Sequence, residues 1–131
     1  MPGNAYGEPL MARILIVDDS PSQLLGLKRL VEKMGHEALT AEDGAAGVEA
    51  AKRELPDLVL MDVVMPNLNG FQATRSISKA PATAHIPVIL VTTKDQDTDR
   101  VWGMRQGARA FVTKPVNEAE LTEAVKEALA K

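Results

Sequence analysis

Short apolar runs alternate with amphipathic stretches along most of the chain. The clearest apolar runs have the length of strands buried on both faces of a sheet, and they occupy residues 14–17, 58–61 and 88–91. Residues 36–41 form a weaker strand pattern, and residues 110–113 give a fifth strand. Apolar residues recur at helical spacing in the segments at about 21–34, 44–55, 71–77, 97–106 and 118–129. Strands joined by helical crossovers must be parallel. The pattern therefore predicts a doubly wound α/β fold, with one five-stranded parallel sheet and five flanking helices.

Capping signals support several of these boundaries. Ser20 supplies an N-cap and Pro21 a proline at the first helical position, while Gly35 is expected to end the same helix. Asn117 followed by Glu120 resembles a capping box, which predicts the start of the last helix. These signals place the helix ends independently of the apolar pattern.

The length and composition indicate one globular domain. The chain has 131 residues, of which 45% are hydrophobic and 25% are charged, as in an average globular protein. Residues 1–10 contain two prolines and two glycines and show no periodicity. We therefore expect a flexible tail over residues 1–11 and a single domain over residues 12–131.

Charge and cysteine content exclude several classes of function. The formal net charge of −3 gives no general attraction to DNA or anionic lipid, so we expect no nucleic-acid partner. The chain has no cysteine, which excludes disulfides, thiolate metal sites and thiol catalysis. Its longest apolar runs are far shorter than the ~20 residues of a membrane span, so we expect no membrane insertion. These properties favour a cytoplasmic protein.

Polar residues follow the predicted strands at their carboxyl ends, where open α/β sheets bind ligands. They are Asp18, Asp19, Asp62, Thr92, Thr93 and Lys114. Each alone has an ordinary role, such as capping a helix or closing a turn. Three carboxylates brought together repel one another, and such clusters usually persist around a cation or a proton. Oxygen ligands with no His or Cys beside them favour Mg²⁺, or Mn²⁺, over zinc.

Carboxylates, a divalent cation, a hydroxyl and an ammonium are the groups that phosphoryl transfer needs. Asp62 is the candidate nucleophile because it ends a strand near the sheet centre, and Asp18 and Asp19 are the candidate metal ligands. No glycine-rich loop follows the first strand, which argues against a nucleotide or flavin phosphate site. Aspartyl phosphatases usually carry a second carboxylate two residues after the nucleophile. Val64 occupies that position here, which argues strongly against such an enzyme.

Six motifs in order resemble the receiver domain of response regulators. They are Val-Asp-Asp-Ser at 17–20, Leu-Met-Asp at 60–62, Met-Pro at 65–66, Asn-Gly at 69–70, Val-Thr-Thr at 91–93 and Lys-Pro at 114–115. The resemblance covers about residues 13–130. It implies the strand order 2-1-3-4-5, and the chain length leads us to expect a stand-alone regulator without an effector domain.

The resemblance implies a role for each residue of the acidic cluster. Asp62 would accept a phosphoryl group. Asp19 and Asp62 would bind Mg²⁺ directly, Asp18 would act mainly through water, and the backbone carbonyl of Val64 would complete the protein ligands. Lys114 would bind a phosphoryl oxygen, and the Lys114–Pro115 bond is expected to be cis.

The same resemblance implies a switch away from the acidic cluster. Thr92 would move toward the phosphoryl group with the Thr93 amide assisting, and Phe111 would rotate inward in response. Phe111 stands where tyrosine is commonest, so its inward and outward states differ only in packing. Trp102, on the fourth helix, would lie on the face formed by helix 4, strand 5 and helix 5, where this family binds its targets.

The expected phosphoryl donor is a histidine kinase or a histidine phosphotransfer domain, and the expected output is a contact with a downstream protein. The protein would not be an enzyme, beyond catalysing its own phosphorylation and dephosphorylation. Residues 93–108 resemble stand-alone regulators of type IV pilus twitching motility, so we expect a role there or in chemotaxis. The alternative is an interaction module that keeps the fold and ignores phosphate.

Two residues that flank the predicted site bear on phosphate lifetime. Val64 lies two residues after Asp62, and Lys94 lies two residues after Thr92. An attacking water would meet an apolar side chain and a cation there. We hypothesise that Lys94 shields the phosphoryl group and slows its hydrolysis.

Overall fold

The computed structural model describes residues 11–130, which form five strands and five helices in alternation. The tail predicted over residues 1–11 lies outside the described residues except for Met11, which is exposed. The elements are β1 (Arg13–Val17), α1 (Pro21–Lys33), β2 (Glu37–Ala41), α2 (Gly44–Glu54), β3 (Leu58–Met61), α3 (Gly70–Lys79), β4 (Val88–Thr92), α4 (Asp97–Arg105), β5 (Ala110–Thr113) and α5 (Glu118–Leu129).

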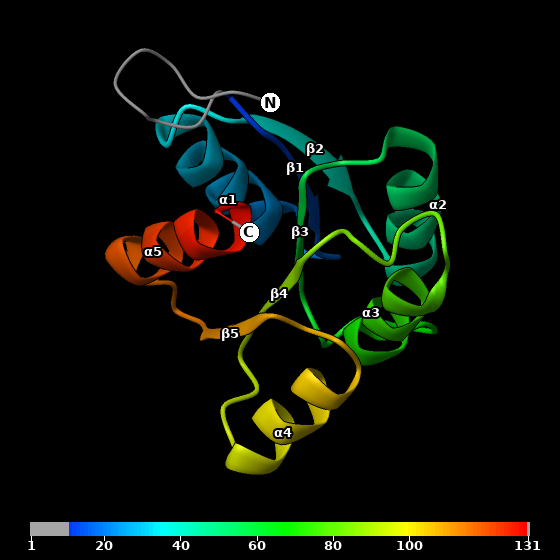
Figure 1. Ribbon diagram of the computed structural model, residues 1–131. Coiled ribbons are helices and arrows are strands. Elements are labelled where there is room, and N and C mark those ends of the chain that lie inside the picture. Colours follow the sequence, from blue (N-terminus) through cyan, green and yellow to red (C-terminus); the bar gives the residue numbers. More distant parts are fainter. Residues whose placement is uncertain (1–10, 131) are drawn as a thin grey trace.

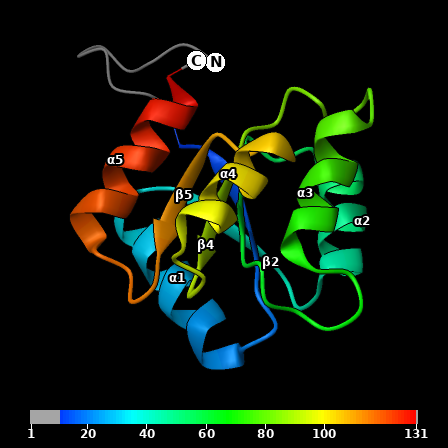
Figure 2. The same cartoon turned by 90° about the horizontal axis from the view of Figure 1, so that it is seen from below.

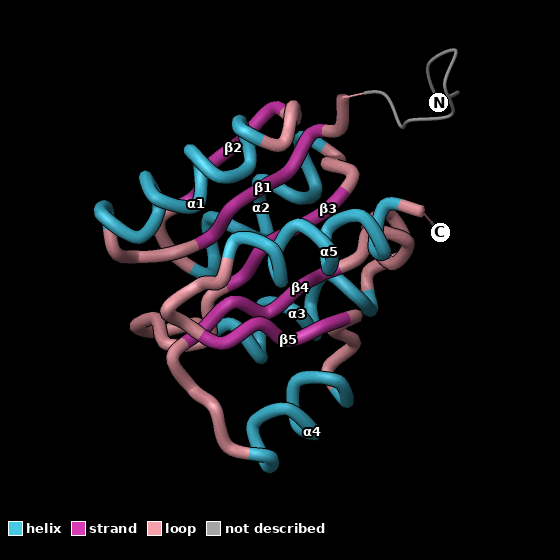
Figure 3. The backbone as a smooth tube through the Cα atoms, turned by 90° about the vertical axis from the view of Figure 1, so that its left-hand side faces the viewer, coloured by secondary structure: helices cyan, strands magenta, loops and turns pink. Residues whose placement is uncertain are grey.

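The strands form one parallel sheet in the order β2-β1-β3-β4-β5, which confirms the predicted fold class and strand order. Figure 1 shows α1 and α5 on one side of the sheet and α2 and α3 on the other. Figure 3 shows the five strands in that order, with α4 at the β5 end. No helix within residues 11–130 is long and apolar enough to cross a membrane.

Strand side chains alternate between two hydrophobic clusters, one on each face of the sheet. Leu15, Met61 and Leu90 pack with α2 and α3, whereas Ile16 and Leu60 pack with α1 and α5. A strand covered on both faces needs apolar residues at every position. This is why the central strands β1, β3 and β4 read as nearly continuous apolar runs in the sequence.

The helix starts follow the predicted caps. Pro21 is the first residue of α1, and the Ser20 hydroxyl accepts a hydrogen bond from the Gln23 amide. The Asn117 side chain accepts from the Glu120 amide at the start of α5. These bonds satisfy amide groups that a helix leaves unpaired at its N-terminus.

Several predicted boundaries differ from the structure by one or two residues, and two of these differences have a clear local reason. Helix α3 begins at Gly70, one residue before the predicted start, because Asn69 and Gln72 form a reciprocal capping box. Helix α2 ends at Glu54 because Leu55 adopts a left-handed conformation with φ of 47°. Neither feature changes the fold.

Helix α4 has fewer buried residues than the other four helices. Within α4, all of which the structure describes, Gly103 is the only buried residue. A Cβ atom at this position would press against the Leu90 side chain, so glycine lets the helix approach the sheet closely. Val101, Trp102 and Met104 remain 53%, 50% and 48% exposed. The helix therefore presents apolar side chains to solvent.

Candidate functional site

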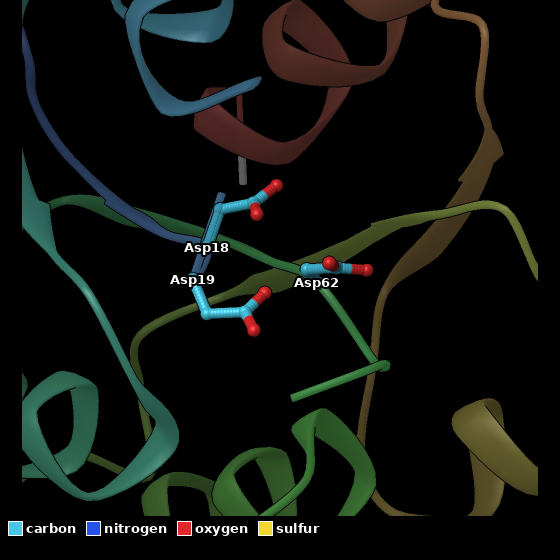
Figure 4. A group of neighbouring side chains, drawn as sticks. All are labelled: Asp18, Asp19 and Asp62. Atoms are coloured by element: carbon cyan, nitrogen blue, oxygen red, sulfur yellow. The ribbon is translucent and has the colours of Figure 1, made fainter. Parts of the chain in front are cut away.

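The register of the two central strands places Asp18 beside Asp62. Val17 of β1 pairs with Met61 of β3, and each aspartate is the next residue. The Asp62 amide donates to the Val17 carbonyl at 2.9 Å. Carboxylate oxygens of Asp18, Asp19 and Asp62 lie within 4.8 Å of one another, and Figure 4 shows the three side chains gathered at the strand ends. The structure thus brings the three predicted carboxylates together.

The ends of the next two strands, β4 and β5, add Thr92 and Lys114 to the site. Thr92 pairs with Thr113, and the Lys114 amide donates to the Thr92 carbonyl at 2.8 Å. The Lys114 ammonium lies 2.6 Å from Asp18 Oδ2 and 3.6 Å from Asp62 Oδ2. One buried cation therefore faces two buried carboxylates, and it is closer to Asp18.

Hydrogen bonds fix the orientation of the buried carboxylates. Asp18 Oδ1 accepts from the Ser20 amide at 2.9 Å. Asp62 Oδ1 accepts from the Val64 amide at 3.4 Å, and the nearby Thr92 hydroxyl favours the ionised Asp62 carboxylate. Asp18 and Asp62 are 1% and 8% exposed, whereas Asp19 is exposed. The site is therefore ordered on its inner side and open to solvent at Asp19.

Burial raises the pKa of Asp62 above its usual value, and the charge of Asp18 adds to this effect. The Lys114 ammonium and the Thr92 hydroxyl oppose it by favouring the ionised carboxylate. An acid whose folded pKa lies above its unfolded pKa costs the fold stability once the pH exceeds both values. The ionised form of Asp62 therefore lowers the free energy of unfolding at pH values above both pKa values.

Comparison with known proteins identifies the family. Residues 14–126 match the response regulator receiver domain. The chain belongs to this family. The motifs that carried the resemblance in the sequence lie, in this receiver, at the strand ends around the acidic cluster.

Individual relatives cover almost the whole of the described receiver. Protein PilH of Pseudomonas aeruginosa is 59% identical over 120 residues, which span 92% of this chain and 99% of PilH. The chemotaxis protein CheY4 of Vibrio cholerae has a TM-score of 0.85 and 28% identity, covering 91% of this chain and 99% of that chain. The receiver domain of the sensor histidine kinase PA1611 of Pseudomonas aeruginosa has a TM-score of 0.85 and 27% identity, covering 92% and 99%. That domain carries a magnesium ion coordinated in its active-site cleft.

The donor set of this receiver fits Mg²⁺. Asp18, Asp19 and Asp62 offer only carboxylate oxygens, and Lys114 balances one of their three charges. Hard oxygen donors with excess negative charge favour Mg²⁺ over softer metals. The exposed Asp19 leaves a side of the cluster from which an ion and its waters can enter.

The remaining predicted residues lie around this cluster. Thr93 is exposed beside it, and the Lys114–Pro115 peptide bond is cis. Phe111 is partly buried against the hydrophobic cluster on the α2–α3 face of the sheet, and Trp102 is half exposed on α4. The structure therefore spreads the proposed switch residues from the acidic site to the surface of α4.

Sequence reasoning missed Gly70, Asp99 and Arg100 as residues that shape this region. Gly70 lies so close to the Asp62 and Val63 backbone that an added Cβ would overlap it. Asp99 pairs with Lys94, and Arg100 contacts β5. The Asn-Gly motif was the only signal for Gly70, while the contacts of Asp99 and Arg100 depend on how α4 lies against the sheet.

Proposed function

We propose that this receiver accepts a phosphoryl group on Asp62 from a phosphohistidine and converts it into a change at a protein-binding surface. One observation carries the proposal: the Asp62 carboxylate lies among two further aspartates, with the Lys114 ammonium 3.6 Å away. A carboxylate acts as a nucleophile when nearby cations neutralise the charge on the incoming phosphoryl oxygens.

In the proposed step, an Asp62 carboxylate oxygen forms a bond to phosphorus as the phosphorus–nitrogen bond of phosphohistidine breaks. The leaving imidazole keeps the electrons of that bond. Asp18, Asp19, Asp62 and the Val64 carbonyl would hold Mg²⁺, which supplies positive charge beside the phosphoryl oxygens. Lys114 would pair with a phosphoryl oxygen. The proposal includes no substrate turnover, so the protein is a regulator that catalyses only its own phosphorylation and dephosphorylation.

The switch in this proposal begins at Thr92. Its hydroxyl lies close enough to Asp62 to lower the pKa of that carboxylate, so it stands where it can follow a phosphoryl oxygen added there. The exposed Thr93 would contribute its amide. Phe111 of β5 pairs with Leu90 of β4. Two residues further along both strands, Thr113 pairs with Thr92. Movement of Thr92 would thus alter the packing of Phe111.

A hollow beside the site supports a phosphohistidine-carrying partner. It has a volume of about 430 Å³ and opens between α1 and the segment after β5. Leu30, Pro115 and Val116 contribute apolar surface to it, and Lys114 and Thr93 also line it. A helix of a histidine kinase or phosphotransfer domain that docked there would bring its histidine to the acidic cluster. Partners of this kind are part of the proposal.

The similarity to PilH supports the expected role in type IV pilus twitching motility, with chemotaxis as the broader class. We propose that this receiver works in the cytoplasm and contacts its target through α4, β5 and α5. The half-exposed Trp102 and its apolar neighbours on α4 supply part of this surface. Phosphorylation would replace the single negative charge of the Asp62 carboxylate by a phosphoryl group of about −1.5 to −2, and this change would bias a two-state equilibrium.

The deciding experiment is the intact mass of the protein after incubation with acetyl phosphate and Mg²⁺. We expect one added phosphoryl group, lost in the Asp62→Asn variant and in a chelator-treated sample. An adduct that persists in the variant would contradict Asp62 as the acceptor. An adduct that forms equally with chelator would contradict the role of the metal.

The alternative is a receiver that binds partners without phosphorylation. It predicts no added mass and no binding of beryllofluoride, with the fold intact by circular dichroism. The acidic cluster weighs against this alternative, because a scaffold has no need for three carboxylates within 4.8 Å. Beryllofluoride binding without a stable mass adduct would instead indicate a short-lived phosphoryl group.

Lys94 is expected to prolong the life of the phosphoryl group. Its amide donates to Thr92 Oγ1 at 3.4 Å, and its ammonium lies 3.8 Å from Asp99 Oδ1 at the edge of the site. A Lys94→Glu variant should lose phosphate about fivefold faster, the effect of roughly 1 kcal/mol of charge interaction near the surface. The decay of the phosphorylated mass after removal of the donor measures this rate.

Lys126→Glu makes the same charge change at an exposed position on α5 and serves as the control. Equal lifetimes in the Lys94 variant and the wild type would remove the shielding hypothesis. Equal acceleration in both variants would assign the effect to net charge.

A further inference from the structure

Arg100, near the start of α4, holds β5 through three contacts. Its guanidinium donates to Thr113 Oγ1 at 3.0 Å and to the Phe111 carbonyl at 3.4 Å. Its Cζ atom lies 5.0 Å from the centroid of the Phe111 ring, within the range of a cation–π interaction. The planar fork of arginine can make such contacts together, which a lysine ammonium cannot.

These contacts fall on the part of β5 that pairs with the proposed switch strand. Phe111 pairs with Leu90, and Thr113 pairs with Thr92. Residues two apart in a strand share a face of the sheet, and Leu90 and Phe111 both pack on the α2–α3 face. Arg100 therefore contacts the same face of the sheet on which Thr92 lies.

Helix α4 buries little of its own surface. Gly103 is the only buried residue in this fully described helix, and Figure 2 shows α4 lying across β4 and β5. Val101 and Trp102 directly follow Arg100 and are half exposed. A displacement of Phe111 or Thr113 would be passed through Arg100 to these exposed side chains.

We propose that Arg100 is a positioning residue that makes α4 follow Phe111 and Thr113. The inference rests on the proposed phosphorylation of Asp62 and specifies how that event reaches the surface. Phe111 has no hydroxyl through which to make a side-chain hydrogen bond. Arg100 provides the polar link from the neighbouring helix instead, joining the ring, its carbonyl and Thr113 to the start of α4.

The test uses beryllofluoride with Mg²⁺ as the phosphoryl analogue. Fluorine NMR of the bound fluoride measures occupancy, and the fluorescence of Trp102, the single tryptophan, measures the response of α4. The variants are Arg100→Gln, Arg100→Lys and the control Arg105→Gln, which removes the same charge from an exposed position on the same helix. Occupancy and response are recorded on the same samples.

We expect the Arg100→Gln variant to bind beryllofluoride but to lose at least about half of the fluorescence change per bound ligand. Arg100→Lys should restore part of the response, and Arg105→Gln should keep it. An unchanged response in Arg100→Gln at full occupancy would overturn the proposal. So would an equal loss in Arg105→Gln, or a wild-type protein whose Trp102 does not respond to bound ligand.

Hydrogen exchange of the protein without beryllofluoride separates this proposal from the proposed function. Loss of the Arg100 contacts should speed amide exchange in α4 of Arg100→Gln, while Arg105→Gln exchanges like the wild type. If the wild type fails to bind beryllofluoride, the proposed function fails. Separately, amide exchange in α4 that is the same in Arg100→Gln as in the wild type would show that Arg100 does not hold α4 in place.

Discussion

Replacing Lys114 by methionine is expected to lower the free energy of unfolding at pH 7 by roughly 2–3 kcal/mol. The Lys114 ammonium lies 2.6 Å from Asp18 and 3.6 Å from Asp62, and only 8% of its side chain is exposed. Methionine fills a similar volume but leaves two buried carboxylates without their cation. Fully enclosed pairs lose about 3–5 kcal/mol, and the opening at Asp19 reduces the loss here.

The pH dependence of this loss should follow the carboxylates. Burial already raises the pKa of Asp62, and removing Lys114 takes away a charge that opposes the rise. The destabilisation should therefore be largest above the folded pKa of Asp62 and shrink as the pH falls through it, because protonation removes the repulsion. Urea unfolding in chelator at a series of pH values from 7 downwards measures this dependence.

Mg²⁺ should restore part of the stability of the Lys114→Met variant, since a bound cation replaces the missing charge. Lys126→Met, on the exposed side of α5, is the control and should unfold like the wild type. A Lys114 variant as stable as the wild type at pH 7 would contradict the view that this ammonium holds the carboxylates together. A deficit independent of pH would assign the loss to packing.

Replacing Gly70 by alanine is expected to destabilise the fold by roughly 1–3 kcal/mol and to impair phosphorylation of Asp62. A Cβ at this position would overlap the Asp62 carbonyl and come within 2.7 Å of the Val63 Cα. These are backbone atoms, so they cannot move aside as a flexible side chain would. The end of β3 must shift, and Asp62 would shift with it.

Gly26→Ala is the matched control because Gly26 lies within α1 and has no heavy atom within 4 Å of the added Cβ. Alanine there should stabilise the fold by about 0.5–1 kcal/mol, the usual gain in a helix interior. Thermal unfolding and the acetyl phosphate mass assay compare the two variants. If Gly70→Ala is as stable and as readily phosphorylated as the wild type, close packing at Gly70 does not position Asp62.

Much of the fold could be predicted from the sequence because the central strands are buried on both faces. Residues 58–61 read as an unbroken apolar run and have the predicted bounds in the structure. Prediction of boundaries failed where a local hydrogen bond or backbone angle decided them. The capping box of Asn69 and the left-handed Leu55 are examples that hydrophobic periodicity does not encode.

The acidic cluster could be predicted because it depends on topology alone. Residues that follow parallel strands share one edge of a sheet, so Asp18 and Asp62 had to approach one another once their strands were neighbours. The preference of Lys114 for Asp18 over Asp62 could not be predicted, because it depends on a difference of 1.0 Å between two distances of 2.6 Å and 3.6 Å. Contacts of Arg100 likewise depend on the placement of α4 against β5.

The position of β1 between β2 and β3 has a consequence for the order in which the chain folds. The first 62 residues contain all three of these neighbouring strands, and they are synthesised before β4 and β5. Asp18, Asp19 and Asp62 belong to that early unit, whereas Lys114 arrives with the last segments. The carboxylates and their protein counter-charge therefore come from opposite ends of the chain, and they meet only when the whole sheet has formed.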